Sequence, residues 1–89
     1  MGKTLYKGGL ENNKRQGYGF EKDESKKTVY VGSFYKDKKN GYGEMTYENR
    51  DNIKLKAFWN DDMVKKEEGV FVTANGEKLE LMGDTTYIW

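Results

Sequence analysis

One stretch of the chain occurs twice, and this repetition constrains the fold more than any other feature. Residues 6–20 have the sequence YKGGLENNKRQGYGF, and residues 30–44 have the sequence YVGSFYKDKKNGYGE. Both copies carry Tyr-x-Gly-x-Leu/Phe, then a polar stretch, then Gly-Tyr-Gly, at an offset of 24 residues. A fixed period of roughly 20–50 residues is typical of repeat architectures, in which one unit cannot bury its apolar face alone.

Each copy predicts a β-hairpin. Tyr6, Gly8 and Leu10 alternate with other residues in the first copy, and a period of two places such a set on one face of a strand. The polar residues 11–16 and 36–40 predict the turns, so the second strand of each hairpin is expected to start at Gly-Tyr-Gly. Glycine is weak inside a strand unless another group approaches closely. We therefore expect neighbouring aromatic rings to lie over these glycines.

A third, degenerate unit follows the two clear ones. Leu55, Ala57 and Trp59 keep the alternation, in the places of Tyr30, Gly32 and Phe34. The remaining segments are expected to form a turn at 60–66, a β-branched strand at 70–73, an Asn-Gly turn at 74–77 and the start of a fourth unit at 79–82. The polar connectors are predicted to be solvated loops, at 21–27 and 49–52.

The two clear copies resemble the membrane occupation and recognition nexus (MORN) repeat. The resemblance covers residues 6–47 and implies an all-β fold, in which consecutive β-hairpins form an elongated, twisted, single-layer antiparallel sheet with an aromatic-lined groove. The chain is then one domain over residues 1–89, since its 89 residues leave no room for a second. Its expected units are about 6–27, 28–52 and 53–77, with a partial unit at 78–89.

The composition argues against most kinds of catalysis and against metal binding. The chain has no cysteine and no histidine, so it lacks disulfides, thiol chemistry and the side chain most used for proton transfer near neutral pH. Two pairs of adjacent carboxylates, Asp61-Asp62 and Glu67-Glu68, are expected to point apart in a turn or strand. We predict no enzyme activity and no catalytic, cofactor or metal site. The net charge of +1 favours neither nucleic acid nor a membrane, and no apolar run is long enough to span a bilayer.

The apolar repeat positions predict a binding groove. One face of the sheet is expected to carry an aromatic and aliphatic row that nothing else in the chain can cover fully, and an exposed apolar groove rimmed by charge marks an interaction site. The predicted groove residues are Tyr6, Leu10, Tyr30, Phe34, Leu55 and Trp59. The resemblance implies that such a groove grips a helix or an extended peptide of a partner protein within a multi-subunit complex.

A basic pair near each turn suggests an alternative partner. If successive turns project from one edge, the pairs form a basic ridge that could contact anionic phospholipids, at about 1 kcal/mol per cation. Acidic residues in the same turns offset much of this attraction, so membrane contact is the less favoured hypothesis. The ridge residues are Lys14, Arg15, Lys38, Lys39, Lys65 and Lys66.

The last residues are apolar and are expected to cap the open sheet or to dock onto a partner. Tyr87, Ile88 and Trp89 follow a Gly-Asp pair that can turn the chain, so folding back as a last strand is favoured. No hydrophobic segment follows the first residues, so we expect no signal peptide and a cytoplasmic location. The resemblance adds the cytoskeleton or the ciliary axoneme as the setting, with the chain acting as a non-enzymatic adaptor.

Overall fold

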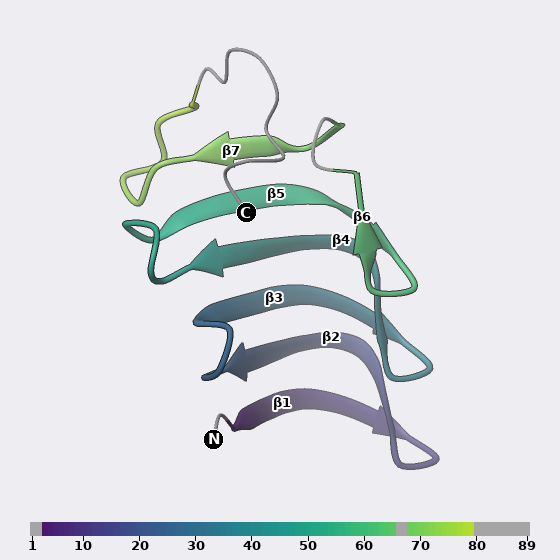
Figure 1. Ribbon diagram of the computed structural model, residues 1–89. Helices are drawn as coiled ribbons and strands as arrows, with labels where there is room; N and C mark the ends of the chain where they lie inside the picture. The colour runs from purple at the N-terminus through teal and green to yellow at the C-terminus, as the bar shows by residue number, and fades with distance from the viewer. Residues whose placement is uncertain (1–2, 66–67, 80–89) are drawn as a thin grey trace.

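The computed structural model describes residues 3–65 and 68–79. These residues form one antiparallel sheet of seven strands, with no α-helix among them (Figure 1). The strands are β1 (Thr4–Glu11), β2 (Lys14–Asp23), β3 (Thr28–Tyr35), β4 (Lys38–Tyr47), β5 (Ile53–Asn60), β6 (Met63–Val64) and β7 (Val70–Val72). Strands β1 to β6 lie in chain order, and β7 also pairs with β5. The predicted single-layer sheet of consecutive hairpins is therefore confirmed.

Two-residue turns close the three hairpins. Both central residues of each turn have positive φ, the signature of the type I′ turn that matches the twist of the flanking strands. These central pairs are Asn12-Asn13, Lys36-Asp37 and Asp61-Asp62. The expectation of longer polar turns and of strands starting at Gly-Tyr-Gly is wrong, because β2 starts at Lys14 and β4 at Lys38. The polar residues 14–16 and 38–40 therefore belong to strands rather than to the turns.

The first connector is shorter than predicted. Strand β2 continues to Asp23, so the first three residues of the expected 21–27 loop belong to the sheet. The loop that remains is held by Asp23, whose carboxylate accepts hydrogen bonds from the Ser25 hydroxyl at 2.7 Å and from the Lys26 N–H at 3.1 Å. Those bonds lower the pKa of Asp23, with the Ser25 hydroxyl contributing most. Glu21 therefore lies in a strand, although the sequence pattern assigned it to solvent.

The third unit keeps the register of the first two but splits its second strand. Leu55 pairs with Met45 as Tyr30 pairs with Glu21, and Ala57 lies opposite Gly43. Strand β5 pairs with β6 near the turn and with β7 further along. The predicted Asn-Gly turn is present, with Gly76 at φ 89° and the Thr73 N–H donating to the Glu77 carbonyl at 2.8 Å.

A row of glycines crosses the sheet and lets tyrosine rings lie against the backbone. Gly8, Gly19, Gly32 and Gly43 are successive partners in the strand registers, and Ala57 continues the row on β5. A Cβ added to Gly19 would lie 2.6 Å from Cε1 of Tyr6, and one added to Gly43 would overlap the ring of Tyr30. The predicted packing of aromatic rings over glycine is therefore confirmed.

Each of these tyrosines is also tied to its own strand. The Tyr6 hydroxyl donates to the Gly9 carbonyl at 2.7 Å, and the Tyr30 hydroxyl donates to the Ser33 carbonyl at 2.9 Å. Both acceptors stand where the register shifts by two residues, because four residue steps on β2 or β4 face two on β1 or β3, and this irregularity is a β-bulge. Bulges increase bending and twist, so the sheet curves at the same place in both units.

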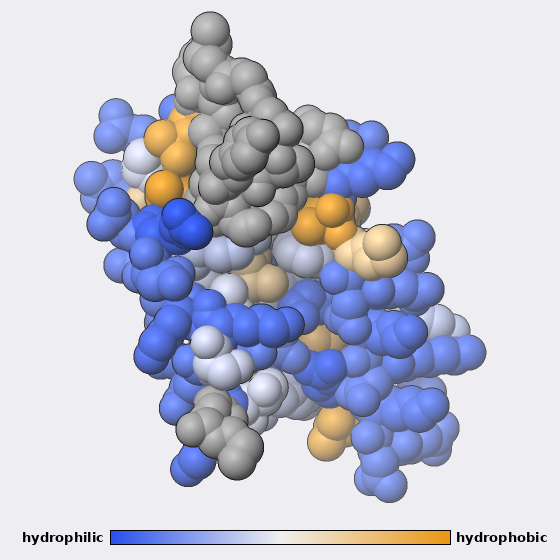
Figure 2. All heavy atoms as spheres, in the orientation of Figure 1, coloured by the Kyte–Doolittle hydropathy of each residue, from blue (hydrophilic) through white to orange (hydrophobic). Residues whose placement is uncertain are grey.

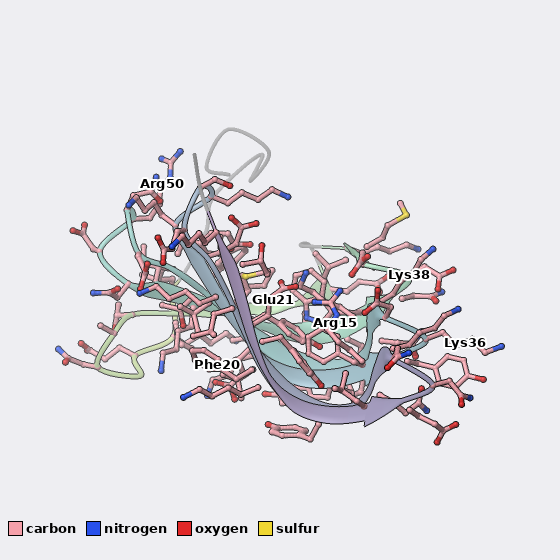
Figure 3. The ribbon with its side chains drawn as sticks, turned by 90° about the horizontal axis from the view of Figure 1, so that it is seen from below. Arg15, Phe20, Glu21, Lys36, Lys38 and Arg50 are labelled. Atoms are coloured by element: carbon pink, nitrogen blue, oxygen red, sulfur yellow. The ribbon has the colours of Figure 1, made fainter. Side chains whose placement is uncertain are left out.

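The curved sheet has an inner and an outer face. Seen from below, the strands bend into a trough, with Arg15 and Glu21 inside the curve and Phe20 outside it (Figure 3). Alternation along the strands therefore assigns Tyr30, Phe34 and Trp59 to the inner face. The core lies there as a thin layer of buried residues: Tyr30, Phe34, Met45, Leu55, Ala57, Trp59 and Phe71.

Candidate protein-interaction surfaces

An aromatic row runs along the inner face across the units. The ring centroids of Tyr6 and Phe34 are 5.2 Å apart, those of Phe34 and Tyr30 are 5.2 Å apart, and those of Tyr30 and Trp59 are 5.4 Å apart. All three contacts are edge-to-face, an arrangement that adds about 0.5–1.5 kcal/mol per pair beyond area burial. The indole N–H of Trp59 donates to the Gly43 carbonyl at 3.4 Å. The row thus links the predicted groove residues into one continuous layer.

Most of this predicted groove is buried, so the expectation that nothing could cover it is wrong. Tyr30 and Leu55 are fully buried, and Phe34 and Trp59 are nearly so. Leu10, at the β1 end of the row, is the exception with 66% of its surface exposed, while Tyr6 is half-buried. Figure 2, which looks onto the inner face, shows mainly hydrophilic side chains with separate hydrophobic patches between them.

Charged side chains from neighbouring strands provide much of the cover. The Arg15 guanidinium lies 4.8 Å from the ring centroid of Phe34 and 5.6 Å from that of Tyr6. The Lys39 ammonium lies 5.5 Å from the ring centroid of Tyr30. Cations over aromatic faces are attracted by the ring quadrupole. These contacts place a layer of charge directly on top of the aromatic row.

Glu21 joins the two cations. Its carboxylate accepts a hydrogen bond from Arg15, and its other oxygen lies 3.0 Å from the Lys39 ammonium. All three side chains are at least four-fifths buried. We call Arg15, Glu21 and Lys39 the inner charged layer. The repeat offset could have identified Glu21, because it occupies the place of the buried Met45 one unit later.

A recurring aspartate ties each unit to the one before it. The Asp37 N–H donates to the Arg15 carbonyl at 3.0 Å, and the Asp62 N–H donates to the Lys39 carbonyl at 3.0 Å. Their carboxylates accept in return from the N–H groups of the same residues, at 3.3 and 2.8 Å. These paired hydrogen bonds link successive turns along one edge of the sheet. They restrict the directions in which the Arg15 and Lys39 side chains can point.

Hydrogen bonds and burial shift the pKa values of several side chains on the inner face. Burial alone would lower the pKa of the Arg15 guanidinium, but hydrogen bonds to Asp37 and Glu21 outweigh it and raise that pKa. The same Arg15 bond holds the pKa of Asp37 below its ordinary value. Burial raises the pKa of the Tyr30 hydroxyl far above its ordinary value, and it raises that of Tyr47 as well. Arg15 and Asp37 therefore carry their charges at neutral pH, whereas the buried Tyr30 and Tyr47 are neutral.

The predicted basic pairs do not form a ridge as pairs. Lys14 and Lys38 are exposed at the start of their strands, while the next residues, Arg15 and Lys39, turn onto the inner face. Strand alternation sends adjacent residues to opposite faces. Lys65 pairs with Glu68 at 3.9 Å, and Lys66 lies outside the described residues.

The third pair was also placed at the wrong position. Since the Asp61-Asp62 turn matches Lys36-Asp37, the residues that correspond to Lys38 and Lys39 are Met63 and Val64. The third unit therefore has an apolar pair where the first two are basic. Tyr87, Ile88 and Trp89, the predicted cap or docking tail, lie outside the described residues.

The outer face holds exposed aromatics that the groove prediction left out. Tyr18 and Phe58 are 65% and 76% exposed, and Tyr42 is 41% exposed. The rings of Tyr42 and Phe58 meet edge-to-face at 5.5 Å. The period of two already contained this result, because the tyrosine of Gly-Tyr-Gly must face away from the glycines that Tyr6 and Tyr30 cover.

Neither a metal site nor a membrane-spanning helix occurs in the described part of the chain. Its acidic side chains nowhere form a group of three that could hold a metal ion. Within the same residues, no helix has the length and apolar character needed to cross a bilayer. The carboxylates of Asp61 and Asp62 belong to a turn, and Asp62 is engaged with Lys39.

Comparison with known protein families agrees with this geometry. The MORN repeat model matches the chain twice, at residues 6–26 and 30–52, which contain the first two hairpins. No curated protein matches the sequence. MORN repeats are interaction modules for proteins or membranes and are generally non-enzymatic. From the two matches and the sheet of consecutive hairpins, we conclude that this chain belongs to the MORN-repeat family.

Proposed function

We propose that the protein is a non-enzymatic adaptor whose trough docks a helix or an extended peptide of a partner protein. The observation that carries this proposal is the inner face: within the described residues, side chains such as Arg15 and Lys39 cover the continuous aromatic row, and no second layer of secondary structure does. Leu10 adds an exposed apolar side chain at the β1 end of the row, from which a partner could exclude water. The family assignment supports an interaction role.

The buried state of the row changes how the trough would recognise its partner. Most of the predicted groove residues hold the sheet together, so the partner would contact the inner charged layer and Leu10 instead. Arg15 and Lys39 flank the Glu21 carboxylate, which gives the surface an ordered pattern of charge. Such patterns provide specificity and orientation more than affinity. Leu10 supplies the exposed apolar anchor next to that pattern.

The proposed setting is a multi-subunit assembly in the cytoplasm, with the cytoskeleton or the ciliary axoneme as the first places to look. It rests on the family resemblance, which associates small proteins of this type with such assemblies. Contact with anionic phospholipids through the exposed Lys14 and Lys38 is the second candidate. Glu11 and Asp37 lie beside these lysines and weaken that attraction.

Leu10→Asp tests the trough, with Leu5→Asp as its matched control. Both residues lie on β1 and are at least half exposed, but Leu5 faces outward. We expect Leu10→Asp to reduce recovery of partners from native extract by about tenfold or more, as loss of an apolar anchor does, and Leu5→Asp to leave it unchanged. Equal effects of the two variants would refute docking in the trough. Sedimentation with phosphatidylserine vesicles would instead support the lipid candidate.

A further inference from the structure

The outer face carries a strip of exposed apolar side chains that ends in a hollow. The strip consists of Tyr18 on β2, Tyr42 on β4, Phe58 on β5 and Met63 on β6. We propose that this outer strip is a second docking surface, which takes an extended acidic segment with an apolar anchor residue from a partner protein. It is separate from the trough and does not depend on the function proposed for that face.

The strand registers align the outer strip. Tyr18 lies opposite Ser33, and Tyr42 lies opposite Phe58. Ser33 lies on β3, between the strands of Tyr18 and Tyr42, and is next to Gly41. Met63 continues beyond Phe58 with 73% of its surface exposed. Exposed apolar side chains gathered on one face of a sheet are typical of a binding site.

The hollow at the end of the strip offers room for the anchor. It has a volume of about 350 Å³ and is lined by Phe58, Asn60, Met63, Val64, Lys65 and Glu68. Phe58, Met63 and Val64 give it apolar walls, and the other three lining residues contribute polar groups. Pockets that combine an apolar lining with a few polar groups hold a side chain and fix its orientation. Met63 stands where the first two units have a lysine.

The charges on the outer face indicate which kind of segment would bind there. Lys7, Lys54 and Lys56 occupy outward strand positions, and none of them forms a salt bridge within the described residues. Two acids lie at the strip: Glu44, which is opposite Lys56 and 3.4 Å from the Tyr42 hydroxyl, and Glu68, which lines the hollow and pairs with Lys65. Lysines thus exceed acids on this face, whereas the cations of the inner face are already paired. An acidic segment complements this surface, and a basic one would be repelled.

Ring geometry argues against the two other anionic partners. The planes of Tyr42 and Phe58 meet at 66°, so they do not offer the parallel ring faces on which successive bases stack. The strip also lies on the convex side, where a flat bilayer could touch only the crest of the curve (Figure 3). An extended peptide can follow the curvature and place one side chain in the hollow.

Fluorescence polarisation with synthetic peptides tests this proposal. The probe is a labelled peptide of alternating glutamate and leucine, compared with a version in which lysine replaces every glutamate. We expect the acidic peptide to bind, the lysine version to bind at least about tenfold more weakly, and added salt to weaken the acidic peptide. Equal binding of the two peptides would overturn the role of charge and with it the proposal.

Two exposed residues provide the variants. Phe58→Ser and Tyr18→Ser should each weaken the acidic peptide by about tenfold or more, whereas Leu10→Asp, on the other face, should not. An unchanged affinity in Phe58→Ser would place the peptide elsewhere and contradict the assignment. Phe58-dependent binding of oligouridylate or of phosphatidylserine vesicles, without binding of the peptide, would replace it. Since Leu10→Asp tests the trough alone, failure of either docking site leaves the other measurable.

Discussion

The two tyrosines of one repeat unit have opposite environments. Tyr30 is fully buried on the inner face, where its ring covers Gly43 and its hydroxyl donates to the Ser33 carbonyl. Tyr42 belongs to the same hairpin but points outward, where its hydroxyl lies 3.4 Å from the Glu44 carboxylate. The difference shows that strand parity, and not residue type, decides whether an aromatic side chain builds this sheet or presents a surface.

The largest expected effect comes from removing the two rings in turn. Tyr30→Ala should lower the free energy of unfolding by about 3–5 kcal/mol, the range for a buried aromatic truncated to alanine. Tyr42→Ala should cost less than about 1 kcal/mol, because its side chain has little packing to lose. Urea denaturation of the two variants measures both values. Similar losses would show that the two faces contribute equally to the core.

Gly43→Val should have the next largest effect. The added side chain would occupy the space of the Tyr30 ring, and overpacking of this kind costs about 1–3 kcal/mol. Gly17→Asn is a suitable control, because Gly17 has no atom within 4 Å of its added Cβ and asparagine tolerates its φ of 81°. Thermal unfolding compares them. An unchanged melting temperature in Gly43→Val would contradict the packing of the ring over glycine.

Alkaline titration sharpens the same comparison through the hydroxyl groups. Burial raises the pKa of Tyr30 in the folded protein, so its contribution to stability is complete below the unfolded value of about 10 and is lost as pH rises above it. Phenolate absorbance should therefore show a late ionisation step of Tyr30 that accompanies unfolding. Tyr30→Phe should remove this late step, and its persistence would assign it to another tyrosine.

Phe58→Ser should have the smallest effect on folding. An exposed side chain outside the core usually changes stability by no more than about 0.5 kcal/mol. Chemical denaturation checks this value, and normal stability is also what makes the variant useful in the peptide measurements. A loss of several kcal/mol would show that the outer face is part of the core after all.

The repeat made the fold predictable from the sequence, but it did not predict which side chains on each face are exposed. The offset between Tyr6 and Tyr30 was enough to predict the hairpins, the sheet and the packing of rings over glycine. The prediction that the groove is exposed was wrong, partly because Arg15 lies over Phe34 and Lys39 lies over Tyr30. The direction of these two cations depends on a two-residue turn that could not be recognised within the polar stretch. Glu21 was missed for a related reason, since its charged neighbours suggested a loop rather than a strand.

The two-strand unit sets a spacing along the trough. Neighbouring strands lie about 4.8 Å apart, so equivalent positions such as those of Phe34 and Trp59 recur at intervals of roughly 9.5 Å. Two turns of an α-helix advance about 10.5 Å over seven residues, and one turn of a polyproline II segment advances about 9.3 Å over three. A helix laid across the sheet would therefore present every seventh residue to equivalent sites, and a polyproline II segment every third.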